Sequence, residues 1–129
     1  MTVVYVAGPF RAANAWEIAQ NINRAATAAL EVWLMGAVAI CPHLNSAPFQ
    51  GAAPDLTWLT GYLELLERSD VVLMLPGWEQ SRGASAEYAR ARQLYKPIVF
   101  GVDEAREWLT RKYTDPSADV QTSGGPDLA

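Results

Sequence analysis

The chain contains little cysteine and little histidine, which restricts the covalent and metal chemistry open to it. Among its 129 residues Cys41 is the single cysteine and His43 the single histidine. One cysteine cannot form an internal disulfide, and the sequence has no Cys/His cluster of the kind that predicts a zinc site. Cys41 is interpreted as a small buried residue of the core. We expect neither a metal nor another cofactor.

Basic residues and long apolar runs are also scarce. Ten Lys and Arg residues stand against fourteen Asp and Glu residues, which gives a formal net charge of −4. The chain therefore lacks the basic footprint of a protein that binds nucleic-acid polymers, although a local loop can still bind a small phosphate. We see neither a signal peptide nor an apolar run of roughly 18 residues. A cytoplasmic protein without membrane contact is the expectation.

Short apolar strands alternate with helices along the chain. Half of the residues are hydrophobic, which is enough for one core in a chain of this length. The expected strands are 2–7, 37–41, 71–75 and 98–101; the expected helices cover about 16–33, begin near 55 and 84, and cover 104–112 after an N-cap at Asp103. This order predicts the α/β class, with a doubly wound parallel sheet of four to five strands flanked by helices.

One domain, residues 1–113, holds all of these elements. Residues 114–129 are rich in Asp, Ser, Gly and Pro and lack periodicity, so we expect a flexible tail there. The first helix is expected to be amphipathic because its apolar residues recur every three or four positions: Trp16, Ala19, Ile22, Ala26, Leu30 and Trp33. The second carries Leu56, Leu59, Leu63 and Leu66 on one face.

Three loops follow the carboxyl ends of the expected strands, at 8–14, 43–54 and 76–83. In parallel sheets of this kind, ligands bind beyond those ends. The three loops hold most of the unusual polar and aromatic residues of the chain. Their convergence is the main structural argument for a binding site.

The third loop leads into the strongest candidate for chemistry, Glu87. The helix is expected to start near Ala84, which places Glu87 in its first turn, where the helix dipole favours the ionised form. Glu87 falls on one stripe with the residues expected to face the sheet, namely Ala84, Tyr88, Ala91 and Leu94. A carboxylate there is costly unless it is used, so we favour catalysis over a capping role.

Other loop residues have both a functional and a plain structural interpretation. Ser81 and Gly83 can present a hydroxyl and free N–H groups to an anion, or act as an N-cap and a turn glycine. The first loop can bring N–H groups and the Arg11 guanidinium to a phosphate, or form a tight turn. His43 can contact a base or sugar, or hydrogen-bond the loop, and Trp78 can stack on a base or pack internally. The candidate substrate-binding residues are Tyr5, Gly8, Pro9, Phe10, Arg11, His43, Asn45, Trp78, Ser81 and Gly83.

Two segments carry a resemblance to a known family. VYVAGP at 4–9 and SDVVLMLPGWEQSRGASAE at 69–87 combine a Gly-Pro loop with Ser-x-Gly-x-x-x-Glu after a strand. In this combination the chain resembles the nucleoside 2-deoxyribosyltransferase-like superfamily, and more narrowly a branch of small, largely uncharacterised phage and bacterial proteins. The similarity runs from Thr2 to about Gly101.

The resemblance implies a flavodoxin-like (Rossmann-like) fold and a site for a nucleoside or nucleoside 5′-monophosphate. It implies that Glu87 attacks C1′ of the sugar and forms a covalent glycosyl-enzyme, which water or another base then resolves. It also implies that Ser81, Gly83 and the loop around Gly8 hold the 5′-phosphate, and that the protein is a homodimer or larger, with a neighbour contributing to the site.

One position departs from the family pattern. Relatives often carry an aspartate eight residues before the aspartate that leads into the third strand, and it helps to position or protonate the leaving base. Tyr62 stands there, and Asp55 lies seven residues earlier, about 10 Å along the helix. Tyr62 can donate a proton to the leaving base, Asp55 can extend into the site from the helix start, or Tyr62 can simply pack.

The expected activity is hydrolysis of the N-glycosidic bond of a (deoxy)nucleoside 5′-monophosphate. The alternatives are base exchange between nucleosides and a non-catalytic nucleotide sensor.

Overall fold

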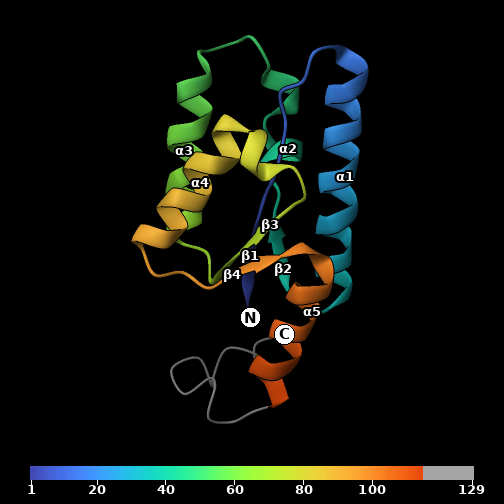
Figure 1. Ribbon diagram of the computed structural model, residues 1–129, viewed down its shortest axis with the longest axis vertical. Helices are drawn as coiled ribbons and strands as arrows, with labels where there is room; N and C mark the ends of the chain where they lie inside the picture. Colours follow the sequence, from blue (N-terminus) through green and yellow to red (C-terminus); the bar gives the residue numbers. More distant parts are fainter. Residues whose placement is uncertain (115–129) are drawn as a thin grey trace.

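The computed structural model describes residues 1–114 and contains one four-stranded, all-parallel sheet (Figure 1). The strand order is β2-β1-β3-β4, and Tyr5 at the centre pairs with Ile40 on one side and Val72 on the other. The strands are β1 (Val3–Ala7), β2 (Val38–Ile40), β3 (Val71–Met74) and β4 (Ile98–Phe100). The predicted doubly wound parallel sheet is confirmed, with four strands.

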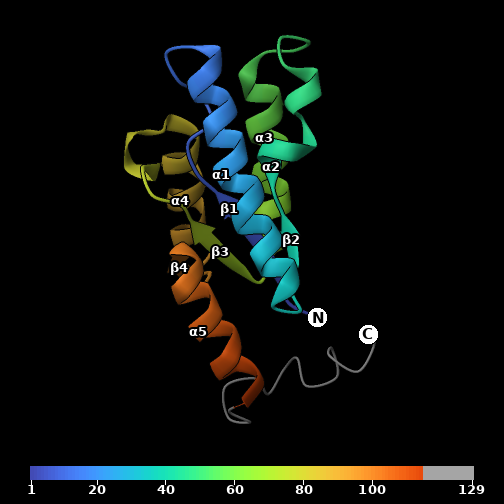
Figure 2. The ribbon, with the colours of Figure 1, turned by 90° about the vertical axis from the view of Figure 1, so that its right-hand side faces the viewer.

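Helices cover both faces of this sheet (Figures 1 and 2). They are α1 (Ala15–Leu34), α2 (Pro42–Asn45), α3 (Asp55–Glu67), α4 (Arg82–Gln93) and α5 (Gly101–Thr114), with 3-10 turns η1 (Ala47–Phe49) and η2 (Trp78–Gln80). α1 and α5 pack on the face that carries Val4 and Val6, whereas α3 and α4 pack on the face that carries Tyr5 and Ala7. Because successive side chains of a strand point to opposite faces, Tyr5 of β1 lies on the face covered by α4.

Two local expectations are wrong, and the start of a third element differs by two residues from the expected one. The segment 43–54 is not a continuous loop, because Pro42 starts the short helix α2 and η1 follows it. α4 begins at Arg82, with Ser81 as its N-cap. α5 begins at Gly101, which has a positive φ, so Asp103 lies inside the helix instead of capping it. α5 extends to Thr114, the first residue of the expected tail, and the rest of that tail lies outside the described residues.

The expected apolar face of α1 is also wrong. An amphipathic helix should bury its apolar stripe, yet Trp16, Leu30 and Trp33 are 71%, 58% and 53% exposed. The buried face consists of small residues, which let the helix approach the sheet closely: Ala25, Ala28, Ala29 and Val32. In α3 the expected leucine face is likewise only partly buried, since Leu66 is buried and Leu56 is exposed.

No helix in the described part of the chain is both long enough and apolar enough to cross a membrane. Cys41 is buried and unpaired, as expected for a small core residue.

Candidate active site

Glu87 is buried on the inner face of α4. The expected stripe is confirmed: Ala84, Glu87 and Ala91 are buried, and Tyr88 and Leu94 pack against the cluster beneath α4. Glu87 is only 7% exposed. Because α4 begins at Arg82, Glu87 lies in the second turn and not in the first, where it was expected.

Tyr5 of β1 donates its phenolic hydroxyl to Oε2 of Glu87. Both groups are buried, and burial disfavours the charged form of a carboxylate. Burial raises the pKa of Glu87 to about 7, although the hydrogen bond from Tyr5 partly opposes this. The helix dipole was expected to favour the ionised form of this carboxylate, but the pKa is raised because desolvation by burial is the larger effect.

Burial also raises the pKa of Tyr5, and the charge of Glu87 raises it further. Tyr5 therefore stays protonated and remains a hydrogen-bond donor across the neutral range. This bond occupies one carboxylate oxygen of Glu87 and leaves the other available for chemistry.

The start of α4 presents unpaired backbone donors. The Ser81 side chain accepts a hydrogen bond from the Ala84 N–H at 3.2 Å, and the Ser85 N–H donates to the Ser81 carbonyl. Within residues 1–114, the N–H groups of Arg82 and Gly83 donate to no protein atom. A Cβ added at Gly83 would meet nothing within 4 Å. Ser81 is thus an N-cap, and the space beside Gly83 is open to an anion.

The first and third loops meet at Gly8 and Pro9. A Cβ at Gly8 would lie 2.9 Å from Cβ of Leu75, so the close approach of the two segments requires glycine. Gly77, in the left-handed region at φ +88°, lies against Pro9: a Cβ there would be 3.2 Å from its Cγ.

The second loop reaches the same place through His43. Its Nε2 donates to the Pro9 carbonyl at 2.8 Å, and its ring lies 5.7 Å from that of Phe10. Burial lowers the pKa of His43, so the ring is neutral. The Nδ1 atom is buried and has no hydrogen-bond partner among residues 1–114. Of the two interpretations of His43, the structure shows the hydrogen bond to the loop, and all three predicted loops are brought together.

Arg11 and Asp55 form an ion pair at the surface, with side chains 58% and 69% exposed. The Arg11 guanidinium also lies 5.9 Å from the centre of the Phe10 ring. A phosphate at Arg11 would compete with Asp55 for that guanidinium. Asp55 is thus engaged at the start of α3, two helical turns from Tyr62.

Tyr62 packs against the cluster that contains Tyr5. Its hydroxyl lies 2.6 Å from Ser46 Oγ and 3.2 Å from the Pro42 carbonyl, both of which can accept its proton, and it accepts from Asn45 Nδ2 at 3.3 Å. Of the two candidates for the missing aspartate, Tyr62 is the one that joins the surroundings of Tyr5.

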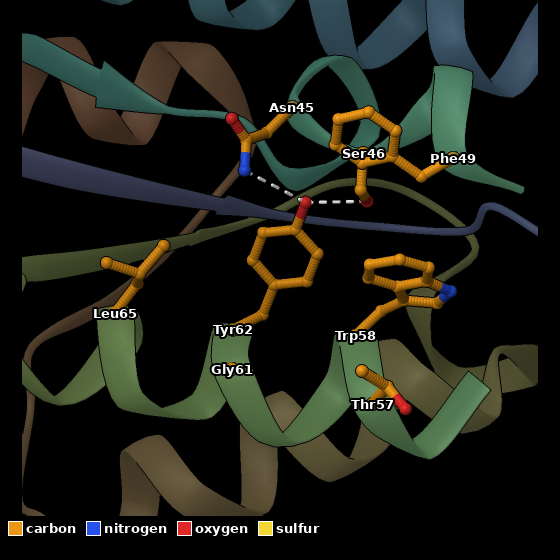
Figure 3. A pocket seen from close by; sticks show the side chains of 8 residues that line it. All are labelled: Asn45, Ser46, Phe49, Thr57, Trp58, Gly61, Tyr62 and Leu65. Carbon is orange, nitrogen blue, oxygen red and sulfur yellow. Dashed lines mark hydrogen bonds between the residues drawn. The ribbon is translucent and has the colours of Figure 1, made fainter. Parts of the chain in front are cut away.

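A cavity of about 210 Å³ opens beside Tyr62, between α3 and the segment after β2 (Figure 3). The rings of Phe49 and Trp58 stack at 6.1 Å on one side of it, and Asn45 and Ser46 supply polar atoms. Its lining residues are Asn45, Ser46, Phe49, Thr57, Trp58, Gly61, Tyr62 and Leu65. The cavity can take a flat ring with polar edges.

Sequence reasoning did not find Ser46, Phe49 or Trp58. The available signal was one aromatic residue, Phe49, in the expected loop 43–54, and a second, Trp58, four residues after the end of that loop. Trp78 was found, but its ring stacks on Tyr88 at 4.4 Å and lies 6.3 Å from Phe100, so the structure shows its packing interpretation.

No group of three or more His, Cys, Asp or Glu side chains within residues 1–114 is arranged to hold a metal ion. A comparison with curated proteins finds no match to this chain. The family model described as a domain of unknown function (DUF4406) matches residues 2–100, which include all four strands and every candidate residue above. Because the match covers well over half of the chain, the protein belongs to the DUF4406 family.

Proposed function

We propose that this protein hydrolyses the N-glycosidic bond of a (deoxy)nucleoside 5′-monophosphate through a covalent intermediate on Glu87. The observation that carries the proposal is the buried Glu87 carboxylate, to which Tyr5 of β1 donates a hydrogen bond. A carboxylate with only a structural role gains nothing from such burial, because a buried carboxylate destabilises the folded state when it ionises. The resemblance of 4–9 and 69–87 to the nucleoside 2-deoxyribosyltransferase-like superfamily supplies the reaction class.

The first step forms a bond between a Glu87 oxygen and C1′ of the sugar. The electron pair of the C1′–N bond leaves with the base, which takes up a proton from the solvent; the proton that water loses in the second step returns to the solvent. Negative charge on Glu87 stabilises the oxocarbenium-like transition state. In the second step water attacks C1′, loses its proton, and returns Glu87 as a free carboxylate beside the sugar 5′-phosphate.

The start of α4 supports the choice of a monophosphate. The free N–H groups of Arg82 and Gly83 and the Ser81 hydroxyl form a small set of donors at the positive end of the helix. The open space at Gly83 leaves room for a phosphate. In this proposal the base occupies the cavity beside Tyr62, which places the sugar between the two.

The test is release of free base from a panel of nucleosides and their 5′-monophosphates, measured by chromatography. Wild type should release base from a monophosphate, and Glu87→Ala should release none. Glu79→Ala, which removes an exposed carboxylate from the loop before α4, is the matched control and should keep full activity. Equal release by wild type and Glu87→Ala would refute the proposal.

A nucleotide sensor with little turnover is the second candidate, favoured by one observation. Tyr62 stands at the position where relatives often carry an aspartate. Its hydroxyl is already hydrogen-bonded to Ser46 and Pro42, so its proton is not free for the leaving base. A sensor would show thermal stabilisation by a nucleoside monophosphate without release of base, since a bound ligand raises the apparent stability.

A further inference from the structure

Within the described chain, the first loop, residues 8–14, has no backbone hydrogen bond between its own residues. Its conformation therefore depends on the neighbouring elements that hold it, because each unsupported residue keeps its backbone entropy. Gly8 and Pro9 pack on the third loop, and two side chains from other elements hold the carbonyl groups that follow. Figure 1 shows this loop rising beside α2 before it joins α1.

His43 and Asn21 each hold one carbonyl group of the first loop. Nε2 of His43, on α2, donates to the Pro9 carbonyl at 2.8 Å. Nδ2 of Asn21, on α1, donates to the Phe10 carbonyl at 3.1 Å. The Oδ1 atom of the same amide accepts from Arg24 at 3.0 Å, which fixes the orientation of the amide. Asparagine is a weaker helix former than alanine, so in the second turn of α1 this side chain serves the loop and not the helix.

These two hydrogen bonds set the direction of the next two N–H groups. All peptide bonds of the described chain are trans, and in a planar trans peptide the C=O and the following N–H point to opposite sides. The Pro9 carbonyl is turned to α2, which follows β2, so the Phe10 N–H is turned to the other side of β1, where β3 and the third loop lie. The Phe10 carbonyl is turned to α1, so the Arg11 N–H is turned to the face of α3 and α4.

Both of these N–H groups are available to a ligand. Within residues 1–114, the N–H groups of Phe10 and Arg11 donate to no protein atom. The start of α4 supplies a second such pair at Arg82 and Gly83, and the first and third loops pack on each other. Donors that are fixed before a ligand arrives bind it with a smaller loss of entropy. The two side chains that hold the first loop therefore affect binding without facing the ligand.

We propose that Asn21 and His43 are positioning residues, which hold the first loop so that the N–H groups of Phe10 and Arg11 face the phosphate of the substrate. This role rests on the proposed function, because the phosphate is that of the nucleoside monophosphate. Each side chain acts through a carbonyl on the far side of the peptide from the phosphate. Without its donor the peptide is free to turn, so phosphate binding weakens while Glu87 is unchanged.

The test uses 2-deoxyribose 5-phosphate, the product of the proposed reaction on a deoxynucleotide, which carries the phosphate without a base. Wild type should bind it in isothermal titration calorimetry. Asn21→Ala should raise the dissociation constant about tenfold, because hydrogen bonds to a charged group are lost. Asn23→Ala, at an exposed asparagine of the same helix, is the matched control and should leave the dissociation constant unchanged.

His43 is buried, so its variants keep a large side chain. His43→Gln retains an N–H group for the Pro9 carbonyl and should keep the binding of 2-deoxyribose 5-phosphate. His43→Leu has no donor and should weaken binding as Asn21→Ala does. Circular dichroism checks that both variants fold, and equal binding by the two folded variants would overturn the role of His43.

Amide NMR signals report on the two N–H groups directly. In wild type the signals of Phe10 and Arg11 should shift as 2-deoxyribose 5-phosphate is added, and in Asn21→Ala the shift of Arg11 should be lost. A merely structural role of Asn21 would lower the stability and leave these shifts in place. Wild-type signals that do not move, or a dissociation constant that Asn21→Ala leaves unchanged, would overturn the proposal.

The positioning role and the proposed hydrolysis can fail separately. Base release by wild type, together with equal binding of 2-deoxyribose 5-phosphate by wild type and Asn21→Ala, would overturn the positioning role alone. Binding that depends on Asn21 in a protein that releases no base would support the positioning role and refute the hydrolysis.

Discussion

At the scale of single residues, the buried carboxylate of Glu87 affects the stability of the fold and, in the proposed reaction, the rate of hydrolysis. Its pKa is raised from an ordinary value of 4.5 to about 7. Between these values the folded chain binds more protons than the unfolded chain, so the free energy of unfolding falls as the pH rises. Below about pH 4.5 the carboxyl is protonated in both states and the penalty is absent.

Glu87→Gln should therefore stabilise the protein in a pH-dependent way. The amide is isosteric with the protonated carboxyl and can still accept the Tyr5 hydrogen bond. At pH 8 the gain should be about 1–3 kcal/mol in the free energy of unfolding, and at pH 4.5 it should vanish. Urea denaturation at both pH values measures this, with Glu79→Gln as the exposed control. A gain of equal size at both pH values would contradict the assigned pKa.

The pH dependence of the proposed hydrolysis follows from the same group. The nucleophile must be ionised, so kcat/KM should reach a plateau above pH 7 and fall about tenfold per pH unit below it. Tyr5→Phe removes the hydrogen bond that lowers the pKa of Glu87, so the midpoint should move to higher pH. Initial rates of base release from pH 5 to 9 measure both midpoints; an unchanged midpoint in Tyr5→Phe would argue against the pairing.

At the scale of elements, the sequence predicted the strands well and some helix faces poorly. Each strand is a short apolar run next to a Gly or Pro, so its position could be predicted from the sequence. α1 has apolar residues around most of its circumference, so periodicity did not show which side meets the sheet. The four-residue helix α2 was missed because a Pro-rich segment is typical of a loop.

The candidate site divides in the same way. The burial of Glu87 and its stripe followed from helical spacing. The raised pKa of Glu87 did not follow from the spacing, because it depends on how deeply neighbouring elements bury the carboxylate in three dimensions. The Tyr5 hydrogen bond and the cavity at Phe49 and Trp58 join residues from different elements. The sequence contains these aromatic residues, but it does not show which of them meet.

Two glycines of the candidate site, Gly8 and Gly83, should respond in opposite ways to the same substitution. Gly8→Ala forces a Cβ against Leu75 and should cost about 1–3 kcal/mol of stability. Gly83→Ala adds a methyl group in open space inside helix α4 and should raise stability by up to about 1 kcal/mol. It should weaken binding of the monophosphate, because the methyl enters the proposed phosphate position. Denaturation and ligand titration measure the two effects; destabilisation by Gly83→Ala would contradict the open geometry.

At the scale of the whole molecule, the folded unit extends beyond the family match. The match ends at residue 100, yet α5 begins at Gly101 and covers one face of the sheet. Ala105 and Leu109 of α5 belong to the buried cluster with Val99. The Thr2 N–H donates to the Tyr113 hydroxyl at 3.1 Å, which ties the end of α5 to the start of β1.

Leu109→Ala should accordingly destabilise the full chain by about 2–4 kcal/mol, because it leaves a cavity beneath α5. Thr110→Ala, at the next and exposed position, should change stability by less than about 0.5 kcal/mol. Thermal and urea unfolding measure the difference. Equal effects would show that α5 contributes little to the core.

The hydrogen bond between Tyr5 and Glu87 also sets when the site can form during folding. It joins residues 82 positions apart, from the inner strand β1 to the helix α4. Contacts so distant in sequence form slowly, after the intervening chain has lost most of its entropy. A nascent chain of which only β1, α1 and β2 have been synthesised does not yet contain Glu87, the hydrogen-bond partner of Tyr5. The candidate site is therefore assembled late, when β3 joins the sheet and α4 packs against it.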